Sequence, residues 1–188
     1  MHMKRILGLS CLILSLFFYI NYLNNNTYGN NQTQTLNSLK KLDLLDTVSK
    51  DNLSLIDTIS IENSKIVGFS TDTSNGVAVY EKNKLGNYIM NEAAIADTDN
   101  INLGASTYRI SYKNQQDLKN SNYGYAVISN GENVAHVEII INNKYKYSKK
   151  LELEKPSLTI IKEELPDSEK KEMKVDIKYY DINNKQII

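Results

Sequence analysis

Most of the chain after its first quarter alternates apolar and polar residues, which is the pattern of half-buried β-strands. The alternation is clearest in residues 106–113, 134–141 and 172–180. In the last segment the apolar side begins with Met173 and ends with Tyr179, and the residues between them on the other side are charged. Because successive strand residues point to opposite faces, each segment predicts a strand with one face on a core and the other in water.

Turn-forming residues separate the apolar runs. Asn and Gly tolerate the positive φ of tight turns, and four such pairs stand between predicted strands: Asn75-Gly76, Asn130-Gly131, Asn142-Asn143 and Asn183-Asn184. The last two pairs predict short hairpins. Since no long helical crossover intervenes, residues 53–188 predict one all-β domain, a mainly antiparallel sandwich or barrel of about nine strands. The polar segment 113–121 is expected to be an internal loop of this domain.

The first 23 residues predict a membrane segment. Lys4 and Arg5 precede an apolar run, Ile6–Ile20, whose length lies between a signal-peptide core and a spanning helix. The first alanine of the chain is Ala78, so the small-residue cleavage pattern is missing. This favours an uncleaved single-pass anchor, with secretion after signal cleavage as the alternative. The positive charge before the run places the N-terminus in the cytoplasm and the rest of the chain outside the cell.

Two short segments connect the expected anchor to the β domain. Residues 24–35 contain no aliphatic and no charged side chain, which predicts a polar tether. Within residues 36–52, apolar residues recur every three positions, which predicts a short amphipathic helix: Leu36, Leu39, Leu42, Leu45 and Val48. We expect this helix to pack on the β domain; a helix that lies on the membrane or mediates oligomerisation is the alternative.

Composition narrows the class of protein. The chain has 22 basic and 22 acidic residues, so no excess charge indicates binding to nucleic acid. The richness in Lys, Asn, Ile and Tyr matches AT-rich codons, which suggests a Gram-positive bacterium of low GC content as the source. The only cysteine, Cys11, lies in the apolar run. The domain outside the membrane therefore has no disulfide, and its own core must stabilise it.

The residues that carry catalytic or metal chemistry are sparse. His136 is the only histidine beyond the expected anchor, which excludes a two-histidine metal site and a Cys-His pair in the β domain. It stands two positions from Glu138 on one strand face, the best acid/base pair available, although polar pairs are common on solvated strands. The run Asp97–Asn100 suggests Ca²⁺, but Ile101 stands where an oxygen ligand is needed. We predict no catalytic, metal or cofactor-binding residue, and no enzyme.

The charged run 162–174 alternates in sign and is expected to be a solvated loop between strands. Tyrosine is enriched, with 13 residues against three phenylalanines and no tryptophan. Tyrosine is favoured at recognition surfaces, and Tyr145 and Tyr147 share one strand face. Adjacent Tyr179 and Tyr180 must point to opposite faces. The sequence therefore suggests Tyr145, Tyr147 and Tyr180 as an interaction surface.

Two functions fit this sequence. The first is a membrane-anchored binding or structural module of a bacterial cell envelope, which uses a sheet face or strand edge to contact another envelope protein, a peptide or a wall polymer. The second is a secreted or tethered hydrolase that cleaves a glycan with two carboxylates, because glycosidases need no histidine. A cleft with two carboxylates would favour the hydrolase, and a tyrosine-bearing face would favour the module.

Overall fold

The computed structural model describes residues 28–45, 50–97, 103–113, 120–169 and 173–187. These ranges form a mostly β structure with ten strands and one short α-helix. The membrane segment predicted over residues 1–23 lies outside them, as does the first part of the tether. Within the described ranges, every helix is too short or too polar to cross a lipid bilayer.

The strands form three antiparallel sheets. Sheet A has the order β1 (Ser54–Ile61), β2 (Ser64–Ser70), β3 (Ser74–Lys82) and β4 (Tyr88–Asp97). Sheet B has the order β5 (Ala105–Lys113), β6 (Ser121–Ser129) and β9 (Ser157–Lys162). Sheet C has the order β10 (Val175–Tyr180), β7 (His136–Ile141) and β8 (Tyr145–Lys150). The helix is α2 (Gln32–Leu39), and a 3-10 turn, η2 (Asp167–Glu169), precedes β10.

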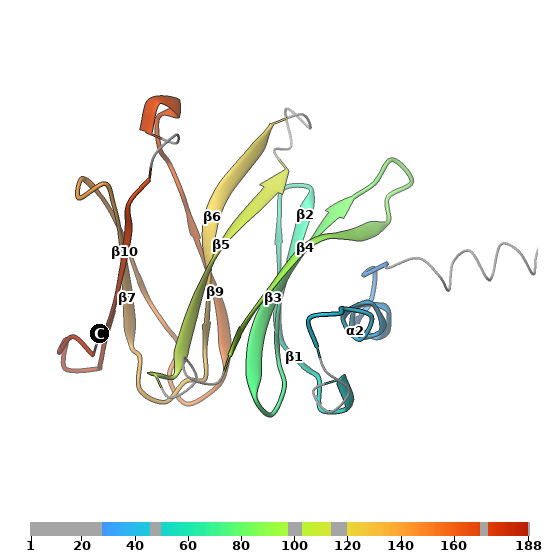
Figure 1. Ribbon diagram of the computed structural model, residues 1–188, viewed down its shortest axis with the longest axis horizontal. Coiled ribbons are helices and arrows are strands. Elements are labelled where there is room, and N and C mark those ends of the chain that lie inside the picture. The colour runs from blue at the N-terminus through green and yellow to red at the C-terminus, as the bar shows by residue number, and fades with distance from the viewer. Residues whose placement is uncertain (1–27, 46–49, 98–102, 114–119, 170–172, 188) are drawn as a thin grey trace, which may run out of the picture.

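The sheets are stacked as layers, with sheet C at one end, sheets B and A next, and α2 against the outer face of sheet A (Figure 1). Three apolar clusters fill the spaces between them. Val137 and Ile139 of sheet C meet Val127 of sheet B, Ile128 of sheet B belongs to the cluster shared with sheet A, and Leu39 of α2 packs on sheet A. The fold is thus a β-sandwich extended by a third sheet.

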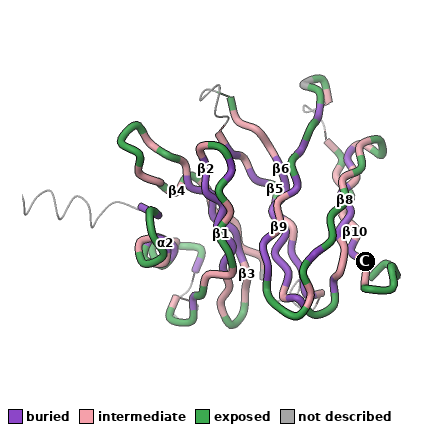
Figure 2. The backbone as a smooth tube through the Cα atoms, turned by 180° about the vertical axis from the view of Figure 1, so that it is seen from behind, coloured by how far each residue is buried: buried purple, intermediate pink, exposed green. Residues whose placement is uncertain are grey.

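The expectation that each strand has one wet face is wrong for β6, because this strand is the centre of the middle sheet. Residues 124–129 of β6 are all buried (Figure 2). On β5, Tyr108 and Ile110 pack toward sheet A as the alternation predicts. The opposite side of β5 is covered in part: the Thr107 hydroxyl is 2.7 Å from the Tyr179 hydroxyl of sheet C, whereas Arg109 on the same side is exposed.

The turn predicted at Asn75-Gly76 lies elsewhere. The β2–β3 hairpin turns at residues 71–73, where the Thr71 amide donates to the Ser74 carbonyl at 2.8 Å. Gly76 is instead paired with Phe69 within the sheet. A Cβ at Gly76 would lie 2.4 Å from the Phe69 ring and 2.6 Å from the Ala94 carbonyl oxygen. Glycine is therefore needed for close packing at this position and not for a turn.

The other predicted turns are confirmed to different extents. Asn142 and Asn143 both have positive φ and join β7 to β8 as a tight hairpin. Gly131 also has positive φ, but its turn carries the chain from sheet B to sheet C instead of closing a hairpin. Asn184 has φ 59°, and the residues after it form only one isolated bridge to the end of β10. Most of the loop expected over 113–121 lies outside the described residues; Lys113 ends β5 and Ser121 begins β6, and these two strands pair in sheet B.

The helix is shorter than predicted and begins earlier. Its N-cap is Asn31, whose side chain accepts a hydrogen bond from the Gln34 amide at 2.9 Å, so that the helix starts inside the expected tether. It ends at Leu39, and Leu42 and Leu45 reach the same apolar cluster through turns instead of a longer helix. Val48 lies outside the described residues. The helix packs on the β domain, as expected.

The charged run after β9 is also not fully solvated. Glu163 has a fully buried side chain and forms two hydrogen bonds, each 3.2 Å, with the guanidinium of Arg109. Leu165 is buried in the cluster between sheets B and C. The sequence pattern alone did not indicate this because the partner, Arg109, lies 54 positions away along the chain.

Candidate binding groove on the outer face of sheet C

The outer face of sheet C carries polar side chains from all three strands. Val137, Ile139 and Ile141 of β7 are fully buried on the inner side, so His136 and Glu138 lie on the outer side. The strand register sets their neighbours. His136 pairs with Lys150 and Tyr180, and Glu138 pairs with Ser148 and Lys178.

A hollow of about 490 Å³ lies at one end of this face, where β10 leads into the C-terminal turn. Apolar and polar residues both line it: Ala135, His136, Ser148, Lys150, Leu151, Leu153, Asp181, Ile182 and Asn184. We call this hollow the sheet C groove. Ile182 is 71% exposed beside it, which is a high exposure for an aliphatic side chain. A mixed lining of this kind is typical of binding sites, where apolar residues supply contact area and polar groups orient the ligand.

Hydrogen bonds of Asp181 hold one wall of the groove in place. Its carboxylate accepts from the amides of Asn183 and Lys185, each at 2.8 Å. After this turn the Ile187 amide donates to the Tyr179 carbonyl at 2.8 Å, which ties the end of the chain to β10. An aspartate that caps its own turn in this way is typical of a tight, ordered loop. Asp181 therefore has a structural role that accounts for its position.

His136 and Glu138 do not form the acid/base pair considered from the sequence. The imidazole Nε2 of His136 lies 2.5 Å from the Ser148 hydroxyl. The ring of His136 also stacks on Tyr180, with 5.2 Å between ring centroids. Glu138 bonds instead with the ammonium of Lys146 at 2.5 Å, and this bond raises the pKa of Lys146. Both polar residues of β7 are thus engaged with other strands.

The sequence pattern did not identify Ser148 as a residue of this site. The β7–β8 register, which the Asn142-Asn143 hairpin fixes, pairs Ser148 with Glu138 and leaves Ser148 diagonal to His136 on the same face. Counting outward from the hairpin gives the pairs His136–Lys150 and Glu138–Ser148, so it does not predict that the Ser148 hydroxyl turns to the diagonal imidazole. A serine hydroxyl within hydrogen-bond distance of a histidine ring is one part of a nucleophilic catalytic site, but such a site also needs a third group that orients the histidine. The carboxylate of Asp181 is engaged by backbone amides of its own turn.

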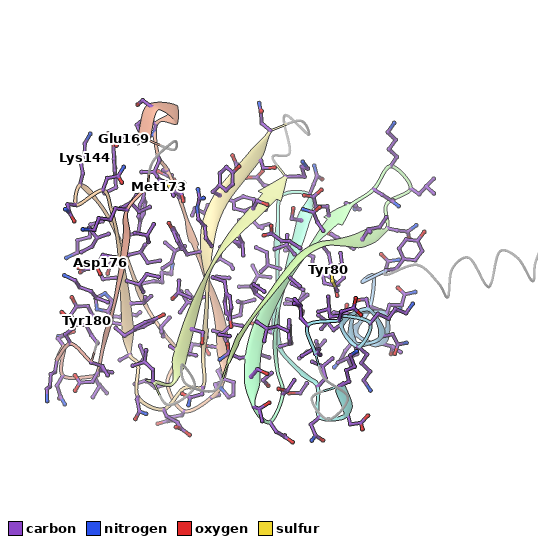
Figure 3. The ribbon with its side chains drawn as sticks, in the orientation of Figure 1. Tyr80, Lys144, Glu169, Met173, Asp176 and Tyr180 are labelled. Atoms are coloured by element: carbon purple, nitrogen blue, oxygen red, sulfur yellow. The ribbon has the colours of Figure 1, made fainter. Side chains whose placement is uncertain are left out.

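The three tyrosines suggested as an interaction surface lie on different sides of sheet C. Tyr145 and Tyr147 pack against the cluster between sheets B and C. The Tyr147 hydroxyl accepts a hydrogen bond from the Glu164 amide at 3.1 Å. Tyr180 lies on the outer face beside the groove, on the same side as Asp176 (Figure 3). The structure therefore brings only Tyr180 of the three to the outer face.

Candidate groups for metal binding or for two-carboxylate catalysis do not gather in the described part of the chain. No group of three or more His, Cys, Asp or Glu side chains in the described ranges is arranged to hold a metal ion. Of the Asp97–Asn100 run that was considered for Ca²⁺ and not predicted to bind it, Asp97 ends β4 and the following residues lie outside the described ranges. The sheet C groove contains one carboxylate, Asp181. Two further hollows contain one each, Asp72 and Glu81.

Comparisons with known proteins found no matching family model, no matching curated protein and no matching solved structure.

Proposed function

We propose that this chain is a binding module of a bacterial cell envelope, that residues 1–23 anchor it in the membrane, and that it contacts its partner through the sheet C groove. The observation that carries the proposal is the groove itself. It combines exposed Ile182 with the hydrogen-bonding side chains of His136, Ser148 and Lys150. A concave surface that combines apolar contact area with several hydrogen-bonding groups is the kind of surface that binding sites use.

The layer order supports this assignment. The described chain begins at Tyr28, which bridges to Ile89 of β4 beside α2. Sheet C is the layer at the other end of the stack (Figure 1). A membrane anchor attached before Tyr28 would leave the groove on the side of the domain away from the attachment point. That is the expected position for contact with a partner beyond the membrane.

The lining indicates the chemistry of the partner. Lys150 and Asn184 donate hydrogen bonds, His136 can donate or accept, and Leu151 and Ile182 supply apolar contacts. A wall polymer with sugar hydroxyls, carboxylates and short peptides presents the complementary groups. We therefore favour wall polymer as the partner, with a peptide segment of another envelope protein as the second choice.

Sedimentation with purified cell wall from a low-GC Gram-positive bacterium tests this proposal. The full-length chain in mild detergent should sediment with the wall, and Ile182→Asp should weaken binding about tenfold, the loss of one central apolar contact. Leu44→Asp is the matched control, because Leu44 is 62% exposed but lies near α2. Equal binding by the two variants would exclude the groove as the binding site.

The same preparation separates the module from the hydrolase. A binding module leaves the wall intact, whereas a glycan hydrolase releases soluble sugar with new reducing ends. Release of sugar by the wild-type chain, lost on replacement of a carboxylate, would favour the alternative. We expect no release. Absence of wall binding by the wild-type chain would exclude the wall polymer and leave an envelope protein as the partner.

A further inference from the structure

The tip of the β3–β4 hairpin exposes an aliphatic side chain. Leu85 is 81% exposed, more than the other large apolar residues in the described ranges. The tip is ordered around it, because the Asn83 side chain accepts hydrogen bonds from the amides of Leu85 and Asn87, each at 2.9 Å. Gly86, with φ 85°, supplies the turn. The hairpin therefore holds Leu85 in water by its own hydrogen bonds.

Basic side chains surround the base of this hairpin. Lys82, Lys84 and Lys113 line a hollow of about 400 Å³. The hollow has one carboxylate, Glu81, which accepts a hydrogen bond from the Asn91 amide group at 3.1 Å. Three cations face one anion, so that the surface beside Leu85 carries net positive charge. An exposed apolar tip beside lysines matches the apolar and anionic layers of a bilayer surface.

The hairpin is tied to the start of the described chain. The Asn30 side chain donates to the Asn87 side chain at 2.9 Å and accepts from the Tyr88 amide at 2.8 Å. The Gly29 amide donates to the Tyr88 carbonyl at 2.8 Å. Beneath them, the buried ammonium of Lys65 donates to the Gly29 carbonyl. The hairpin and the segment that leads toward residues 1–27 thus form one connected unit.

We propose that the β3–β4 hairpin docks on an anionic lipid bilayer, with Leu85 among the acyl chains and Lys82 and Lys84 at the phosphate headgroups. This inference rests on the proposed membrane anchor. Seven residues, 21–27, separate the apolar run from Tyr28, and an extended chain of that length reaches at most roughly 25 Å. A chain anchored by the apolar run therefore keeps the hairpin within reach of the bilayer.

Tryptophan fluorescence of the full-length chain in lipid vesicles tests the docking. The chain contains no tryptophan, so Leu85→Trp introduces a single reporter at the tip. Ile182→Trp is the matched control, since Ile182 is also highly exposed but lies at the sheet C end. In phosphatidylcholine vesicles that contain phosphatidylglycerol, we expect the reporter at position 85 to shift to the blue and to be quenched by quencher-labelled lipid. The reporter at position 182 should keep the emission of an indole in water.

Charge variants identify the role of the lysines. Each basic residue near an anionic leaflet strengthens binding about fivefold. In the Leu85→Trp background, Lys82→Gln and Lys84→Gln should each lower the docking equilibrium by about that factor. Vesicles of phosphatidylcholine alone remove the contribution of both lysines, so the loss there should be about 25-fold. Equal quenching in neutral and anionic vesicles would refute the role assigned to the lysines.

Flotation of the vesicles separates failure of the anchor from failure of the docking. If the chain floats with the vesicles but reporters at positions 85 and 182 both stay in water, the docking inference is wrong and the anchor stands. If the chain does not float, the anchor is wrong and the docking inference falls with it. If a soluble polyanionic wall polymer, added without lipid, shifts the reporter at position 85 as strongly as vesicles do, the hairpin binds that polymer and not the bilayer.

Discussion

The ion pair between Arg109 and Glu163 gives the most quantitative test of the layered fold. Glu163 follows β9, and its carboxylate has no exposed area, whereas the Arg109 side chain of β5 is 39% exposed. Two hydrogen bonds of 3.2 Å join them. Arg109 also lies over the ring of Tyr123, 4.6 Å from its centroid. Among the described contacts, the Arg109 guanidinium is the only cation that pairs with the buried Glu163 carboxylate.

Replacement of Arg109 by Met should leave this carboxylate buried without a cation. Breaking a buried ion pair by removing one partner costs about 3–5 kcal/mol. For a chain of 150–250 residues, about 2–4 °C of melting temperature corresponds to each kcal/mol, so the fall should be about 6–20 °C. The double variant Arg109→Met with Glu163→Leu should recover most of that loss, since no unpaired charge remains. Far-ultraviolet circular dichroism of the full-length chain measures the free energy of unfolding in urea and the melting temperature on heating.

The solvent-exposed pair Lys155–Glu152 is the control. Its side chains are 70% and 59% exposed, and Lys155→Gln should cause no measurable change, as is usual for pairs in water. If Arg109→Met destabilised the chain by less than about 1 kcal/mol, Glu163 would not be buried between the sheets. A double variant as unstable as the single one would also refute the reasoning, because the loss would then come from packing.

Two further predictions address the core. Gly76→Ala should destabilise the domain by about 1–3 kcal/mol, because the new Cβ meets the Phe69 ring and the Ala94 carbonyl, and urea unfolding should show it. Gly68→Ala, whose Cβ has its nearest neighbour at 3.4 Å, should cost less, and equal costs would contradict the packing. Burial also raises the pKa of four tyrosines to about 12: Tyr80, Tyr108, Tyr112 and Tyr125. The folded state keeps these protons when the unfolded chain has released them near pH 10, so stability is full below about pH 10 and is lost as the pH rises toward 12. Phenolate absorbance should therefore show a late ionisation that accompanies loss of the far-ultraviolet signal, and ionisation of every tyrosine near pH 10 in a folded chain would refute the burial.

The sequence pattern predicted strands better than it predicted their partners. The alternation in residues 106–113, 134–141 and 172–180 is confirmed by β5, β7 and β10. Alternation indicates which side of a strand is apolar, but it does not indicate what covers the polar side. In sheet B part of that side is covered by sheet C, and small polar groups such as the Thr107 hydroxyl fit there by bonding across the interface. The number of layers therefore could not be read from the pattern.

Local signals failed where a distant contact decided the conformation. Asn75-Gly76 resembles a turn, yet Gly76 serves close packing against Phe69, which only the sheet register reveals. Glu163 resembles a solvated residue, yet Arg109 holds it in the interior. In the groove, His136 was recognised because histidine is rare in this chain. Ser148 gave no such signal, because its hydroxyl reaches the imidazole across a diagonal of the sheet and not across a register pair.

Photo-crosslinking in the cells that make the protein tests the central claim most directly. A photoreactive residue replaces Ile182 at the sheet C groove, and the control replaces Leu44 near α2, which is exposed to a similar degree. We expect position 182 to form a discrete adduct with wall polymer or with one envelope protein, and Tyr180→Ala to reduce that adduct because it removes the ring stacked on His136. Position 44 should form no such adduct. If the two positions gave the same products, or if position 182 gave none, the sheet C groove would not be the binding site of this protein.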